Sequence, residues 1–288
     1  MPNLYLLFFE LNIYLQFAIC LHHAWRHGTP NLLRLFVGVI FGVTLEIASI
    51  QQFHGYQYSR EFLIMISDVP LCIGVAWSCI LYSAMEFSDA SSLPYWTRPL
   101  LDALLALNID LALDTVAIRL GAWDWGQELK FQYFGVPYGN FWGWFWVIAS
   151  FSFGYRLFAR RTDWMGTWLS PLLGLIIGLV GVLGMDALLI FGVKDPYRNM
   201  VIVLALGAAL LLVMGLRPRF YLRPVASLAF WIPFLTHAYI VVAGLASGVI
   251  LNPPALLWIG LVMTLVAFYL HHPTIQNILG MKYSKEAA

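Results

Sequence analysis

Long apolar stretches separated by short polar breaks dominate the pattern along the chain. A helix needs about 20 mostly apolar residues to cross a bilayer. Stretches of about that length lie at about 4–24, 31–51, 62–84, 100–120, 140–160, 167–192, 198–216, 225–248 and 254–271. The breaks contain proline, glycine and charged residues, as in RHGTP at 26–30, which are residues that end helices. The pattern predicts an all-α, polytopic transmembrane helix bundle of about nine spans (seven to nine).

The composition supports a membrane protein. Hydrophobic residues make up 61% of the 288 positions and charged residues 11%, against roughly 25% charged in average globular proteins. No stretch remains for a soluble domain, so we expect residues 1–288 to form a single integral-membrane domain. The N-terminus lacks a basic region and a cleavage site, so the first span is expected to be retained.

Charge and motifs exclude several kinds of partner and cofactor. The net charge of +1 argues against nucleic-acid binding. The three cysteines lie in apolar runs and form no CxxC pattern, so we expect neither a metal site nor a disulfide framework. Nucleotide-binding loops and metalloprotease motifs are also missing from the sequence. We therefore expect no cofactor and no metal.

The distribution of positive charge predicts the orientation. Of the 16 Lys and Arg residues, five fall on one side of the predicted bundle: Arg60, Arg119, Lys130, Lys194 and Arg198. The others fall on the opposite side, including Lys282 and Lys285 in the C-terminal tail. Cytoplasmic loops carry the excess of positive charge. The prediction is a cytoplasmic C-terminus, an N-terminus outside and an outer location for the segment 121–139.

Acidic residues fall inside the predicted spans, where an ionisable group is costly and is a functional candidate. They are Glu10, Glu46, Asp68, Asp102, Asp110, Asp114 and Asp186. Most share one depth beneath the segment 121–139, and Asp110 and Asp114 share a helix face. A pocket with a neutral carboxylic acid to donate a proton and an ionised one to stabilise a cation fits this set. Alternatively, the acids hydrogen-bond neighbouring helices and hold the bundle together.

An aromatic segment precedes and enters the fifth predicted span. Residues 133–145 are YFGVPYGNFWGWF. The segment could anchor in the membrane surface, where Trp and Tyr are enriched, or it could cover a pocket. The candidate substrate-binding residues are Trp123, Trp125, Tyr133, Tyr138, Asn140 and Trp144. Asn140 could instead cap the fifth helix, and Pro70 is expected to kink the third.

Three stretches resemble a known family. They are LDTVAIRLGAWDW through YFGVPYGNFWGWF at 113–145, LEIASIQQFHGYQY at 45–58 and DVPLCIGVAW at 68–77. They are similar to the integral-membrane carotenoid biosynthesis proteins, which include the carotenoid 1′,2′-hydratases such as bisanhydrobacterioruberin hydratase. Thr115 stands where the family commonly has Pro. The family often has Gly at the position of Asp68, so the resemblance carries no role over to this residue.

The resemblance implies a reaction and a location. A hydratase of this family adds water to the terminal double bond of an acyclic ψ-end carotenoid: protonation at C2′ leaves a tertiary cation at C1′, which water captures. The expected partners are a carotenoid or other long isoprenoid and the lipid bilayer, in a bacterial or archaeal cytoplasmic membrane. Glu46 and Asp114 are the first choices for the catalytic carboxyls, followed by Asp68, Asp110 and Asp186.

Two other functions fit the same residues. A membrane terpene cyclase would use the buried carboxyls to protonate an alkene or epoxide, but it would exclude water. A non-catalytic pigment- or lipid-binding subunit of a membrane complex would tolerate neutral replacements of the acids.

Overall fold

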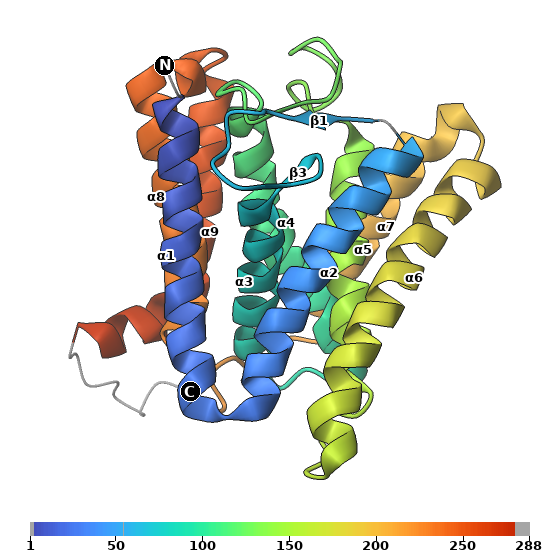
Figure 1. Cartoon of the computed structure of the whole chain (residues 1–288), viewed down its shortest axis with the longest axis vertical. Coiled ribbons are helices and arrows are strands. Elements are labelled where there is room, and N and C mark those ends of the chain that lie inside the picture. The colour runs from blue at the N-terminus through green and yellow to red at the C-terminus, as the bar shows by residue number, and fades with distance from the viewer. Residues whose placement is uncertain (1–2, 54, 280–288) are drawn as a thin grey trace.

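The computed structural model describes residues 3–53 and 55–279, so Lys282 and Lys285 lie outside the described residues. Within these ranges nine α-helices form a bundle (Figure 1). They are α1 (Leu4–His27), α2 (Thr29–Phe53), α3 (Leu71–Ser88), α4 (Arg98–Ala117), α5 (Tyr138–Arg156), α6 (Ser170–Gly192), α7 (Asp195–Gly215), α8 (Leu228–Ser247) and α9 (Ala255–Ile278). The prediction of an all-α polytopic bundle is confirmed.

Successive helices run in opposite directions through the bundle (Figure 1). We call residues 121–137 the lid segment. It joins α4 to α5 at the end of the bundle where α1 begins, and Asn3 Nδ2 donates to Leu120 O at 2.9 Å there. Two short antiparallel pairings shape this end. One joins β1 (Gln57–Tyr58) to β4 (Trp123–Asp124), and the other joins β2 (Met65–Ile66) to β3 (Val69–Pro70).

The third span begins later than the sequence predicts. The apolar run 62–84 was expected to be helical, but α3 starts at Leu71. Pro70 is the N-cap of α3 in extended conformation, so it starts the helix rather than kinking it. Proline lacks an N–H and disfavours helical geometry in the preceding residue. Glu10, which is fully buried, accepts hydrogen bonds from the backbone N–H groups of Leu63 and Ile64 at 2.8 and 3.3 Å.

Seven of the described helices are long and apolar enough to cross a membrane. The other two, α4 and α5, are the helices that carry most of the family-like stretch. Helix α4 contains one arginine and three aspartates, and α5 is rich in aromatic residues, glycine and serine. Both are largely buried by the neighbouring helices, because polar groups in a bilayer must be satisfied inside the bundle.

Close helix contacts place two side chains of the later site. A Cβ added to Gly74 on α3 would lie 2.4 Å from Val43 Cγ2 on α2, and one added to Gly42 would lie 2.8 Å from Trp77 Cβ. Such contacts are possible only with glycine at the interface. They bring α2 against α3, so that Glu46 and Trp77 meet.

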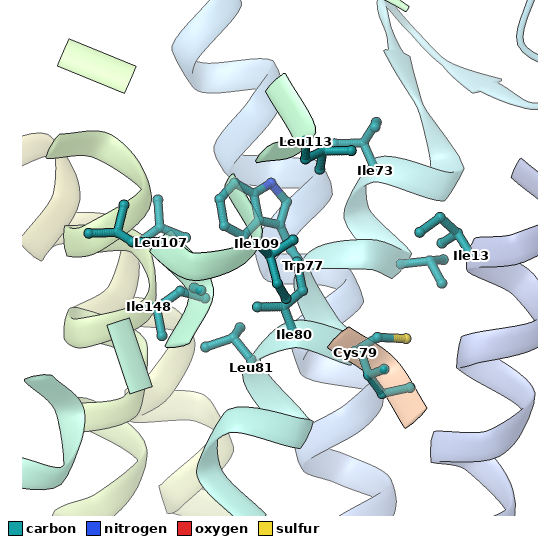
Figure 2. Close-up of a cluster of buried hydrophobic side chains, with 14 of the residues drawn as sticks. Ile13, Ile73, Trp77, Cys79, Ile80, Leu81, Leu107, Ile109, Leu113 and Ile148 are labelled. Atoms are coloured by element: carbon teal, nitrogen blue, oxygen red, sulfur yellow. The ribbon is translucent and has the colours of Figure 1, made fainter. Parts of the chain in front are cut away.

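Buried apolar side chains fill the middle of the bundle. Figure 2 shows the indole of Trp77 at the centre of this cluster, with Ile13 from α1 on one side and Leu107 from α4 on the other. Ile148 contributes from α5. The core thus holds α3 between α1 on one side and α4 and α5 on the other.

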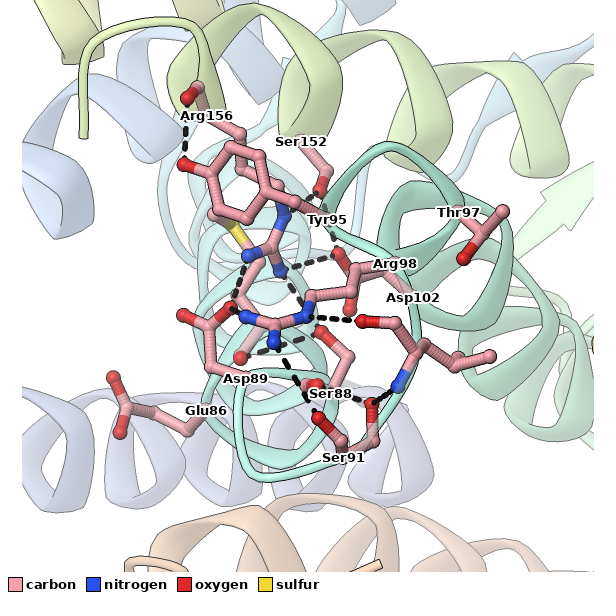
Figure 3. A network of polar contacts seen from close by, with 12 residues as sticks. Glu86, Ser88, Asp89, Ser91, Tyr95, Thr97, Arg98, Asp102, Ser152 and Arg156 are labelled. Carbon is pink, nitrogen blue, oxygen red and sulfur yellow. Dashed lines mark hydrogen bonds and ion pairs between the residues drawn. The ribbon is translucent and has the colours of Figure 1, made fainter. Parts of the chain in front are cut away.

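A buried polar network holds the opposite end of the bundle together (Figure 3). Arg156 on α5 pairs with Asp102 on α4 at 2.9 Å and with Asp89, which follows α3. Ser152 donates to Asp102 at 2.5 Å, and Arg98 pairs with Asp89 at 3.1 Å. The charge of Asp102 is therefore paired inside the bundle. This arrangement fits the alternative in which buried acids bond neighbouring helices and hold the bundle together.

Candidate functional site

A cavity of about 500 Å³ lies beneath the lid segment. Helices α1 to α8 all contribute to its wall. The lining includes Ile13 and Gln16 from α1, Glu46 from α2, Trp77 and Ile80 from α3, Asp114 from α4, Asn140 and Trp144 from α5, Asp186 from α6, Ile202 from α7, Thr236 from α8, and Trp123 and Trp125 from the lid segment. Most of the wall is apolar, with a few convergent polar groups, which is the usual make-up of a ligand pocket.

Glu46 is a buried carboxyl surrounded by hydrogen-bond donors. Its Oε1 accepts from Trp77 Nε1 at 2.7 Å, and its Oε2 accepts from the hydroxyls of Tyr58, at 2.8 Å, and Tyr56. The side chain is 5% exposed. An indole N–H can only donate. Three donors favour the ionised form of the carboxyl, whereas its burial favours the neutral form. The donors therefore offset part of the cost of a negative charge at Glu46.

The two tyrosines belong to the segment that follows α2. Tyr58 lies in β1, and its register opposite Trp123 of β4 places it at the roof of the cavity. Burial, together with the charge of Glu46, raises the pKa of Tyr58 well above its ordinary value. Its hydroxyl therefore stays protonated at neutral pH and remains a donor to Glu46.

Asp110 and Asp114 form a second, paired carboxyl site. They lie one turn apart on α4, both are buried, and both contact the side-chain amide of Asn140. Two buried carboxyls that share a site disfavour double ionisation, which favours a proton on at least one of them. Asn140 Nδ2 on α5 lies 2.7 Å from Asp114 Oδ2 and 3.2 Å from both oxygens of Asp110. We call Asp110 and Asp114 the aspartate dyad; Asp114 lines the cavity and Asp110 lies behind it.

Aromatic rings surround the carboxyls. The Trp77 and Trp144 ring centroids lie 4.4 Å apart, those of Tyr56 and Trp125 lie 4.7 Å apart, and the Tyr58 and Trp123 rings meet edge to face at 5.9 Å. The negative face of such rings can attract a cation. The site thus combines two neighbouring buried carboxyls, a third carboxyl that accepts three hydrogen bonds, and an aromatic wall.

Four of the six predicted substrate-binding residues line the cavity: Trp123, Trp125, Asn140 and Trp144. Tyr133 and Tyr138 are outside the lining. The Tyr133 ring packs edge to face on Phe141, and its hydroxyl donates to Leu111 O at 3.2 Å. The expectation that Asn140 caps α5 is wrong, because Pro137 is the N-cap and Asn140 lies within the first turn.

The remaining predicted acids have different positions. Asp186 on α6 lines the cavity, as do Arg198 and Asn199 on α7, and it is half-buried. Asp68 does not lie in a spanning helix as expected. It sits in the turn between β2 and β3, is 55% exposed and pairs with Arg60. The delayed start of α3 leaves it outside the cavity lining.

Sequence reasoning missed several polar residues of the site. Tyr56, Tyr58 and Trp77 bind Glu46, and Gln16 and Thr236 line the inner end of the cavity. Tyr56 and Tyr58 are two positions apart in an extended segment, and this spacing places their side chains on the same face. The spacing could have identified them. No local spacing points to Trp77, Gln16 or Thr236, because partners on different helices have no fixed distance in sequence. Among the described residues, no cluster of three or more His, Cys, Asp or Glu could hold a metal ion.

Comparison with known proteins identifies the family. The family model described as carotenoid biosynthesis protein matches residues 4–214, which include Glu46, the aspartate dyad, the lid segment and Asp186. No curated protein and no solved structure matches the chain. With its apolar spans, the chain is an integral membrane protein with a role in carotenoid biosynthesis, and it belongs to the carotenoid biosynthesis protein family.

Proposed function

We propose that the protein is a carotenoid 1′,2′-hydratase, which adds water to the terminal double bond of an acyclic ψ-end carotenoid. The observation that carries this proposal is the aspartate dyad: two buried carboxyls that share the amide of Asn140, one of them, Asp114, on the wall of a mostly apolar cavity. Protonating an unactivated alkene needs a carboxylic acid in an apolar environment beside the double bond.

In the first step, Asp114 donates its proton to C2′ and the π electrons of the alkene form the new C–H bond. The carboxylate left on Asp114 accepts a hydrogen bond from Asn140 Nδ2, which lies 2.7 Å from Asp114 Oδ2. This bond stabilises the conjugate base and favours release of the proton. Asp110 is in this scheme a positioning residue, because it does not line the cavity.

The cation at C1′ is stabilised by charge and by ring faces. In this scheme Glu46, held by three donors, is the ionised carboxylate of the same cavity. The rings of Trp77, Trp125 and Trp144 supply negative faces. Groups aimed at the place where charge develops are effective because they need no reorganisation during the reaction.

In the second step, a water oxygen bonds to C1′ and the water gives one proton back to the dyad. The net change is the addition of one water to the double bond, and no oxidant or reductant is consumed. Polar side chains at the lid side of the cavity, Gln127 and Asn140 among them, give water hydrogen-bonding partners. A cyclase would need to exclude water from the cation, so this lining favours hydration.

The test uses amide replacements with a matched control. Asp114→Asn and Glu46→Gln keep side-chain size but remove the acidic proton and the charge. Purified variants are incubated with an acyclic carotenoid that has ψ-ends, and the products are separated and weighed by mass spectrometry. We expect Asp114→Asn to lose about 10²- to 10⁴-fold in rate, the usual contribution of general acid catalysis. Asp68→Asn, an exposed replacement outside the cavity, should keep the parent rate.

Other outcomes assign other functions. Products isomeric with the substrate would identify a cyclase. If the parent binds carotenoid without converting it, and Asp114→Asn binds as tightly, the protein is a binding subunit and the hydratase proposal is wrong.

A further inference from the structure

The cavity wall contains a carboxyl group that the reaction scheme does not use. Asp186 on α6 lines the cavity and is half-buried. It forms no hydrogen bond or ion pair with any residue in 3–53 or 55–279. Arg198, a cation of the same lining, is engaged elsewhere, because it pairs with Asp195 and donates to Val193 O at 3.1 Å. An unpaired carboxyl inside a spanning helix is a candidate for function.

Helix α5 lies between the helices that carry Asp114 and Asp186 (Figure 1). Asn140 Nδ2 on α5 lies 2.7 Å from Asp114 Oδ2 on α4. Two positions further along α5, Trp142 Nε1 donates at 3.3 Å to the backbone oxygen of Met185, the residue that precedes Asp186 on α6. The first turns of α5 therefore contact α4 at one carboxyl and α6 next to the other.

The face that α5 presents to the cavity is bare. Gly139 and Gly143 both line the cavity and lie four positions apart on this helix, which places them on one face. A Cβ added to either glycine would meet no atom within 4 Å, so the space in front of them is open. The flat end group of an alkene can lie along this backbone, between Asp114 on one neighbouring helix and Asp186 on the other.

The lining also gives water a way into the cavity. Gln127 and Gln132 in the lid segment and Asn199 on α7 line the cavity and are exposed. Their amide groups can donate to water and accept from it. A carboxylate inside the cavity can accept a hydrogen bond from such a water and act as the base that removes its proton.

We propose that Asp186 binds the water that captures the cation and takes a proton from it. The proposal rests on the proposed function, in which Asp114 protonates C2′. As the water oxygen bonds to C1′, one O–H bond of the water breaks, its electron pair stays on the oxygen, and the proton moves to the Asp186 carboxylate. The proton then returns to the dyad through water in the cavity, which restores both groups. Acid and base thus act on the end group from two different helices.

Deuterium exchange separates formation of the cation from its capture. In D₂O, Asp114 transfers a deuteron to C2′. A cation that no water captures loses a proton again, and the substrate is recovered with a deuterium in its end group. Mass spectrometry of the product and of the recovered carotenoid therefore measures hydration and cation formation in the same sample.

The variant to test is Asp186→Asn, which keeps the size of the side chain but cannot take up the proton. We expect its hydration rate to fall by about 10²-fold, at the lower end of what general acid–base catalysis contributes, while deuterium still enters the recovered substrate. Asp114→Asn should lose both hydration and exchange. Asp195→Asn removes an exposed carboxyl outside the cavity lining and should keep both rates of the parent.

Each result decides the proposal. Hydration by Asp186→Asn at the parent rate would overturn it. An equal fall in hydration and exchange, or loss of folded protein in size-exclusion chromatography, would also overturn it, because Asp186 would then serve protonation or structure. A parent protein that neither hydrates nor exchanges would refute the hydratase function and this proposal together. An active parent with an equally active Asp186→Asn would refute this proposal alone.

Discussion

The side-chain amide of Asn140 bridges the aspartate dyad: its nitrogen lies 2.7 Å from Asp114 Oδ2 and 3.2 Å from Asp110 Oδ1. The contact links α5 to α4 directly beneath the lid segment. In the proposed reaction, the amide N–H stabilises the carboxylate that forms when Asp114 gives up its proton. The contact is therefore expected to increase the rate of proton transfer to the substrate.

We predict that Asn140→Ala lowers turnover by roughly 10- to 100-fold, the range for a lost hydrogen bond to a charged group. Folded yield, measured by size-exclusion chromatography in detergent, should fall far less than activity does. Equal losses of yield and activity would show that Asn140 serves only to hold α4 and α5 together.

Glu10 is expected to matter for structure. Its carboxyl accepts the N–H groups of Leu63 and Ile64 and the hydroxyl of Tyr14. Glu10→Ala would leave buried donors unpaired, at about 1–3 kcal/mol each, and would loosen the segment before α3. Trypsin should then cut faster at Arg60, which is 68% exposed. Glu10→Gln, which keeps an acceptor oxygen, is the control, and similar cutting of all three proteins would contradict the assignment.

Asp89 gives a prediction about pH. Burial alone would raise the pKa of Asp89, but the guanidinium groups of Arg156, Arg34 and Arg98 together outweigh it, and the pKa lies below its ordinary value. A carboxyl with a depressed folded-state pKa contributes stability above its unfolded pKa of about 4, and this stability is lost as the pH falls through the folded pKa. The melting temperature of Asp89→Asn should therefore lie below that of the parent at pH 7, and the difference should shrink below about pH 4. If the difference in melting temperature were the same at all pH values, the charge of Asp89 would not be the source of the stabilisation.

The orientation is tested with reporter fusions. Arginines gather at the end of the bundle opposite the lid segment, among them Arg98 at the start of α4, Arg156 at the end of α5, and Arg219, whose backbone N–H donates to Ser92. The excess of positive charge predicts that this end is cytoplasmic. A reporter inserted after Lys130 should be active outside, and one fused at Ala288 inside. Signals from the same side would rule out an odd number of spans between the two positions. They would also contradict the prediction that most of the acids lie at one depth in the membrane.

Local patterns were sufficient for much of the architecture. Runs of about 20 apolar residues predict spanning helices, because each helix satisfies its own backbone hydrogen bonds inside the bilayer. The spacing of Asp110 and Asp114 put both on one face of α4, since residues four apart are neighbours on a helix. The aromatic density of 121–145 is consistent with a surface anchor or a pocket cover, and in the structure Trp123, Trp125 and Trp144 line the cavity.

Only the tertiary structure decided which acids meet at the cavity. Seven carboxyls had similar apolar surroundings in the sequence, yet Glu10 holds the segment before α3, Asp102 is paired with Arg156, and Asp68 lies outside in a turn. Hydropathy reports how apolar a stretch is, but not how each helix is rotated or which partner it meets. Glu46 acquires its donors from α3 and from β1, whose pairing with β4 spans more than 60 positions of sequence. Contacts between distant segments depend on packing of the whole bundle, and no local spacing encodes them.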